Sequence, residues 1–223
     1  MASASADKAT VAQTSGLLLA CITGHGSASH PYLGSDELLK GPHCARNQAD
    51  AVHFLCVLHG RYPGIIDHAA NRTVDPLARG WFNGAIEGFG VERAFLTKLA
   101  VAAGPLPSTP GASDNDAVLR AQRHAIEMLA QSERSGCALG AALALVLDWG
   151  AIRVVLDIAA KRFGIESPPY RLTDTTAIRS LADRVEGGQG IKRALLFGAE
   201  QMALQHRGLW DLLEARQQAR GIY

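Results

Sequence analysis

Five long stretches of this chain repeat apolar residues with the period of an α-helix, and each carries a polar residue within its apolar face. The stretches span residues 46–59, 80–103, 114–134, 137–163 and 191–216. The polar residues are His59, Glu92, Gln122, Asp148 and His206. An unpaired polar group in an apolar interior costs free energy, so amphipathic helices keep such groups towards solvent. Five exceptions therefore indicate a shared polar site inside a helical bundle.

The remainder of the chain fits the same architecture. Shorter helices are expected over Val11–Cys21, Asp36–Lys40 and Thr175–Val185, joined by segments rich in glycine and proline. No stretch combines alternating apolar residues with β-branched enrichment, so no sheet is expected. We therefore predict a single all-α domain of six to eight helices over residues 1–223, with residues 1–10 disordered.

Composition restricts the possible partners. The net charge is +1 and no run of Lys or Arg occurs, which argues against nucleic acid. The longest apolar run, residues 137–147, has eleven residues, whereas a bilayer span needs about 20. The N-terminus lacks the basic region of a signal peptide, and the four cysteines sit singly, as reduced thiols do. A cytoplasmic protein with no nucleic-acid or membrane partner is expected.

Asp148 is the most demanding of the five polar residues. Its helix carries Arg153, Asp157 and Lys161 on the opposite side, where we expect a charged stripe facing solvent. An interior carboxylate must be paired, protonated or metal-bound. Alternatively, Asp148-Trp149-Gly150 breaks the helix and Asp148 caps a second one.

The other four polar residues also have alternative interpretations. Glu92 is in mid-helix, and an ion pair with an arginine from another helix would satisfy it. His206 is either a ligand-binding group or a core histidine whose ring nitrogens have hydrogen-bond partners within the protein. His59 ends its helix, where an imidazole can meet free carbonyls. Gln122 is expected to be a buried amide that bridges other polar groups.

Two functional hypotheses follow. The first is an interior site for a small molecule or a metal, built from the five polar residues; mixed nitrogen and oxygen ligands would suit iron, manganese or zinc. Neither Glu92 nor Asp148 has a histidine three residues on, which argues against a ferritin-type di-iron centre, and His124 with Glu127 fits a solvated face. The second hypothesis is a non-enzymatic interaction or regulatory protein, whose buried polar groups fix helix register.

No motif assigns a reaction. GxGxxG, the P-loop, GxSxG and HExxH are all missing, so nucleotide, serine-hydrolase and zinc-protease functions have no support. The small residues of 136–144 would allow close approach of another helix or of a flat ligand. Phe197 and Trp210 lie off the apolar stripe of the last helix. In a monomer, segment 170–185 or the N-terminal arm would have to cover them; otherwise they form an exposed patch, and its burial against a second copy predicts a homodimer.

The chain resembles a bacterial protein family of about this length, with no established activity, in the segments HGRYPGIIDHAA (59–70), AGPLPSTPG (103–111), QRHAIEMLA (122–130) and QHRGLWDLLEAR (205–216). The resemblance covers most of the chain and implies no catalytic residues. Long helices with one Gly/Ala-rich member are also similar, at fold level, to heme-oxygenase-like bundles, including the thiaminase-type branch. By that likeness a heme-ligand histidine near the N-terminus could only be His25 or His30.

Overall fold

A computed structural model describes residues 13–73, 75–109, 111–172, 174–185 and 188–221. These residues form nine α-helices and two 3-10 turns and contain no strand, which confirms the all-α prediction. In chain order the elements are α1 (Thr14–His25), η1 (Ser27–Ser29), η2 (Pro31–Gly34), α2 (Asp36–Leu39), α3 (Cys44–His59), α4 (Ile65–Arg72), α5 (Pro76–Ala102), α6 (Ala112–Ala130), α7 (Cys137–Phe163), α8 (Thr175–Arg184) and α9 (Gln189–Gly221). The disorder expected for residues 1–10 lies outside the described ranges.

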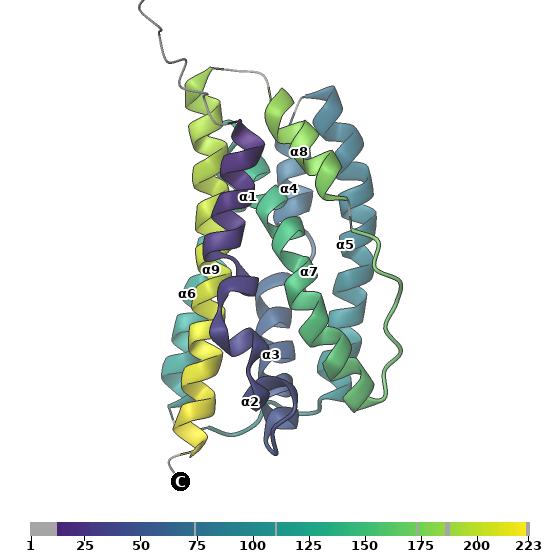
Figure 1. Ribbon diagram of the computed structural model, residues 1–223, viewed down its shortest axis with the longest axis vertical. Helices are drawn as coiled ribbons and strands as arrows, with labels where there is room; N and C mark the ends of the chain where they lie inside the picture. Colours follow the sequence, from purple (N-terminus) through teal and green to yellow (C-terminus); the bar gives the residue numbers. More distant parts are fainter. Residues whose placement is uncertain (1–12, 74, 110, 173, 186–187, 222–223) are drawn as a thin grey trace, which may run out of the picture.

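Helix α7 is the centre of the bundle, with α9 and α5 on opposite sides of it (Figure 1). It also contacts α3, α4 and α6, so it is apolar around most of its circumference. The helix runs unbroken from Cys137 to Phe163, through Asp148 and Gly150. The alternative in which Asp148 caps a second helix is therefore wrong.

Helices α7 and α9 run parallel and approach each other closely through glycine (Figure 1). A Cβ atom at Gly140 would overlap the backbone carbonyl of Leu195, and one at Gly198 would overlap that of Cys137. The small-residue half of α7 thus receives another helix, the first of the two expected uses. Asp148 and His206 each lie eight residues beyond one of these glycines, so the same packing sets their register.

Helix α4 is the element that the sequence analysis missed. The sequence predicts that the helix over 46–59 is stopped by Gly60 and Pro63, and that the next one begins only at Asp75 or Arg79. The structure instead starts a helix at Ile65, where the Asp67 carboxylate accepts a hydrogen bond from the Gly64 N–H at 2.8 Å. Eight residues give little periodic signal, and packing against α5, α6 and α7 stabilises so short a helix.

Arg153 is buried, contrary to the predicted solvent stripe on α7. Its guanidinium donates to Glu92 on α5 and to the backbone oxygen of Pro168, each at 2.5 Å. Residues after α7 fold back along it, so a face that periodicity places outside is covered. Of the predicted stripe, Asp157 stays partly exposed and pairs with Arg153 at 2.8 Å, and Lys161 is exposed.

Trp210 is fully buried, so it does not contribute the exposed patch expected on the last helix. Its neighbours on α9 hold the chain after α1, because Arg207 donates to the Ser29 hydroxyl at 3.3 Å and Asp211 pairs with His30 at 2.9 Å. Phe197 is 41% exposed. The homodimer stays a prediction, and it now depends on Phe197 alone.

Among the residues that the structure describes, one helix is long and apolar enough, by length and composition, to cross a membrane. This is α7, and 78% of its most apolar 18-residue window is buried inside the bundle. The central helix of a soluble bundle has the same composition, so the finding is weak support for a membrane span. Absence of a membrane partner and cytoplasmic location remain predictions.

The glycine contact between α7 and α9 predicts the effect of a single methyl group. Gly140→Ala should lower the free energy of unfolding by about 3 kcal/mol, because the methyl meets backbone that cannot rotate away. Gly84→Ala is the control: it lies within α5 with open space at its Cβ position, and helix propensity should raise stability by about 0.5–1 kcal/mol. Urea unfolding measures both. A neutral Gly140→Ala would contradict the close approach.

Candidate functional site

Three of the predicted site residues form one buried hydrogen-bonded chain. Asp148 of α7 accepts from His206 of α9, with 2.6 Å between Oδ2 and Nδ1. The Nε2 atom of His206 lies 2.9 Å from the Nε2 atom of His59, the last residue of α3. All three side chains are at most 5% exposed. Helices that are distant in sequence thus converge on a single polar row.

Ser27 holds the other end of this chain. Its backbone N–H donates to Oδ1 of Asp148 at 2.7 Å and its hydroxyl to Oδ2 at 2.5 Å. Gly26 allows this approach, because a Cβ atom there would lie only 2.5 Å from the same carboxylate. Ser27 was not predicted as a site residue, since a serine in a loop of small polar residues gives no sign of its distant partner.

The hydrogen bonds fix where the protons lie. A carboxylate has no proton to donate, so Nδ1 of His206 carries the hydrogen in its bond to Asp148. One proton then lies between the two Nε2 atoms. When both rings are neutral, His59 donates from Nε2 and its Nδ1 atom keeps a lone pair. A proton gained at Nδ1 lets the Nε2 proton pass to His206, whose charge then lies beside Asp148.

The surroundings of His59 favour its neutral form. Burial lowers the pKa of His59 well below its ordinary value, and the nearby His206 and Arg93 lower that pKa further. The imidazole lies edge-on to Trp149, with ring centroids 5.5 Å apart, and to Phe89 at 6.4 Å. These rings hold the imidazole in one orientation. When the His59–His206 pair takes up a proton, the positive charge is therefore better placed on His206 than on His59.

His59 also lines a small cavity. Its volume is about 50 Å³, enough for a few water molecules or one small functional group. The walls come from α3 to α7 and the 60–64 connection. Its polar lining residues are His59, Arg61, His68, Arg123 and Glu127. Because Nε2 of His59 is bonded to His206, Nδ1 is the ring nitrogen left for a molecule in this cavity.

Residues 22–221 match the family described as "Family of unknown function (DUF6975)". The chain belongs to this family. Neither a curated protein nor a solved structure matches it. The likeness to heme-oxygenase-like bundles therefore has no structural match to support it, and the family itself assigns no activity.

Glu92 of this DUF6975 chain belongs to a separate, closed network. Its carboxylate accepts from the Trp149 indole N–H at 2.9 Å and from Arg153 at 2.5 Å, and it is 0% exposed. Burial raises the pKa of Glu92, against the lowering effect of these two donors. The expected ion pair with an arginine from another helix is thus present, and Glu92 does not join the histidine chain.

Gln122 lies apart from the other four residues. Its side chain is partly buried between α6 and α9, where Nε2 donates to the backbone oxygen of Gln205 at 3.4 Å. It packs against Gly208, not against the histidines. Ile126, four residues further along the same face of α6, does line the cavity, so periodicity along one helix does not show which residues of a face reach the site.

The described residues contain no group of three or more His, Cys, Asp or Glu side chains arranged to hold a metal ion. Both ring nitrogens of His206 are bonded within the protein, which leaves it no lone pair for a metal. A heme ligand near the N-terminus does not fit either. His30 uses Nδ1 to accept from the Tyr32 N–H and Nε2 to donate to Asp211, and His25 is exposed at the end of α1.

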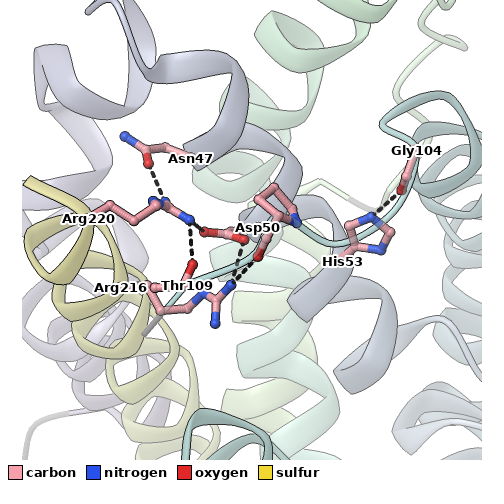
Figure 2. A network of polar contacts seen from close by, with 8 residues as sticks. Asn47, Asp50, His53, Gly104, Thr109, Arg216 and Arg220 are labelled. Carbon is pink, nitrogen blue, oxygen red and sulfur yellow. Dashed lines mark hydrogen bonds and ion pairs between the residues drawn. The ribbon is translucent and has the colours of Figure 1, made fainter. Parts of the chain in front are cut away.

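Another buried carboxylate joins α3 to the end of α9 (Figure 2). Asp50 accepts from Arg216 at 3.0 Å and from Arg220 at 2.5 Å. The same two guanidiniums bind Thr109 and the backbone of Pro107 in the proline-rich connection. The sequence analysis missed this cluster, although an acidic residue in the apolar stretch 46–59 was a visible signal. Its position indicates a structural role.

The Asp50 cluster predicts a large stability effect. Asp50→Asn removes the charge that compensates two buried guanidiniums, so the free energy of unfolding should fall by about 3–5 kcal/mol. Asp36→Asn, which removes the exposed partner of Lys40, should change stability by less than about 1 kcal/mol. Urea unfolding measures both. Similar small losses in the two variants would show that the arginines do not depend on Asp50.

The lowered pKa of His59 predicts a pH dependence. An unfolded histidine takes up a proton near pH 6.5, whereas folded His59 stays neutral to lower pH. Its stabilising contribution is therefore complete above pH 6.5 and is lost as pH falls towards the folded pKa, by up to about 1.4 kcal/mol per pH unit. Between pH 6.5 and 5 the free energy of unfolding of His59→Gln should fall less steeply than that of wild type. His124→Gln, on the exposed side of α6, should show the same dependence on pH as wild type. Equal slopes in all three proteins would contradict the assignment.

Proposed function

We propose that the protein binds a small molecule in the cavity beside His59 and exchanges a proton with it through the Nδ1 atom of His59. The observation that carries this proposal is the hydrogen-bonded chain Asp148–His206–His59, which begins at a buried carboxylate and ends at a cavity. A purely structural network has no need to end at open space.

The chain can take up a proton without placing charge on His59. The bound molecule loses a proton from an O–H, N–H or C–H group to Nδ1 of His59. The proton on Nε2 of His59 passes to Nε2 of His206 across 2.9 Å. The positive charge then lies on His206 beside the Asp148 carboxylate, as in other carboxylate–histidine arrangements. Reversal of the two transfers returns the proton to the product.

His206 and Asp148 are positioning residues in this proposal. Neither lines the cavity, and they act by fixing the proton on His59 and by holding the charge that it passes on. Ser27 and the aromatic rings of Phe89 and Trp149 keep this hydrogen-bonded chain rigid. The reaction class that fits is general acid–base chemistry on a small polar substrate.

The second candidate function is a non-enzymatic interaction or regulatory protein. The closed Glu92–Trp149–Arg153 network favours it, because every partner there is a protein group and the contacts fix α5 against α7. In that case the hydrogen-bonded chain Asp148–His206–His59 would also serve only to set helix register. The two candidates differ in whether the cavity binds anything.

Histidine tautomers test the proton relay directly. In wild-type protein at pH 8, two-bond 15N–1H spectra should show His59 protonated at Nε2 and free at Nδ1, with His206 protonated at Nδ1. Asp148→Asn should disturb both tautomers, because an amide can donate to His206 where the carboxylate only accepts. A wild-type spectrum with the His59 proton on Nδ1 would overturn the relay, whatever the variant does.

Ligand binding separates the two candidate functions. A thermal-shift screen of small polar molecules should give compounds that stabilise wild-type protein and fail to stabilise His59→Gln. His43→Gln is the matched control, since His43 is exposed at the start of α3, outside the relay and away from the wall of the cavity. Compounds that stabilise all three proteins equally, or no compounds at all, would count for the interaction protein.

A further inference from the structure

The small cavity beside His59 adjoins an open depression on the surface. The depression has a volume of about 340 Å³ and includes His53, Cys56 and Gly60 in its wall. Val57, Arg61 and Arg123 line both hollows, so the two lie against the same side chains. A molecule placed in the depression can therefore reach past the two arginines towards His59.

The side chains along this route carry more positive than negative charge. Arg123 pairs through Nε with Glu127 at 2.9 Å, which leaves its two terminal nitrogens free to donate. Arg61 is exposed and has no ion pair within the described part of the chain. Two guanidiniums thus face one carboxylate. A guanidinium presents its N–H groups as a planar fork that matches the oxygens of a carboxylate or phosphate.

The connection that carries Arg61 is held firmly in place. Asp67 accepts from the Gly64 N–H at 2.8 Å and from Arg93 at 2.5 Å, and this ion pair is largely buried. The guanidinium of Arg93 also lies over the ring of Tyr62, 5.5 Å from its centroid. Before Arg61, the Gly60 N–H donates to the backbone oxygen of Cys56 at 2.9 Å. The backbone beside Arg61 is therefore fixed on both sides, so a ligand need order only the arginine side chain.

We propose that the substrate is a small molecule with an oxyanion group, a carboxylate or a phosphate, which Arg61 and Arg123 bind while its reacting group enters the cavity beside His59. This inference rests on the proposed function of His59. The sizes of the two hollows agree with it, because the inner one admits only a small group and the outer one has room for a head group.

Titration with simple anions tests the proposal. Inorganic phosphate and acetate are added separately at constant ionic strength, and the side-chain signals of His59 and His68 are followed by NMR. At least one anion should shift these signals in a saturable way. Arg61→Gln and Arg123→Gln should each raise its apparent Kd about 10-fold or more, as expected for a lost charge-assisted hydrogen bond. Arg179→Gln, which removes an exposed charge on α8, should leave the Kd unchanged.

The outcomes distinguish a phosphorylated substrate from a carboxylate, and they distinguish failure of the oxyanion proposal from failure of the proton relay. Saturation by phosphate alone supports a phosphorylated substrate, and saturation by acetate alone supports a carboxylate. No saturable shift with either anion, or a Kd that neither arginine substitution changes, overturns the oxyanion proposal. The His59 tautomer is measured without any anion, so the relay can survive that result or fail independently of it.

Discussion

A carboxylate in the middle of the central helix is the constraint on which the candidate site depends. Asp148 cannot remain charged and unpaired in an interior formed by the helices packed around α7. Its compensation comes from two other parts of the chain: Ser27, which follows α1, and His206 of α9. The bundle must therefore bring α9 and the turn after α1 against the same point of α7. His59 joins this arrangement through His206.

Three of the buried carboxylates in the described residues have different partners, and the partners decide what each can do. Glu92 binds Arg153, and Asp50 binds Arg216 and Arg220. A guanidinium does not release its proton in proteins, so these pairs can fix helices but cannot carry protons. Asp148 binds an imidazole, which can accept a proton at one ring nitrogen while it donates one from the other. Among these three clusters, only that of Asp148 has the chemistry of a relay.

The close packing of α7 against α9 determines whether Asp148 and His206 meet. Glycines allow the two backbones to approach, and the approach fixes how far one helix is displaced along the other. Since Asp148 and His206 follow Gly140 and Gly198 by the same eight residues, a shift of one helical turn would separate carboxylate from imidazole by about 5 Å. The small residues thus position the site without touching it.

The sequence by itself determined the fold class, all eight expected helices to within a few residues of their ends, and the burial of Glu92, Asp148, His59 and His206. Periodicity carries that information, because it reports which side of a helix is apolar. It misplaced Arg153, since α7 is covered on a second side, and it missed α4, Ser27 and Asp50. Partners distant in sequence leave no mark on the local pattern. Which carboxylate meets an imidazole and which meets a guanidinium was decided only by the tertiary structure, because the packing of the helices sets those distances.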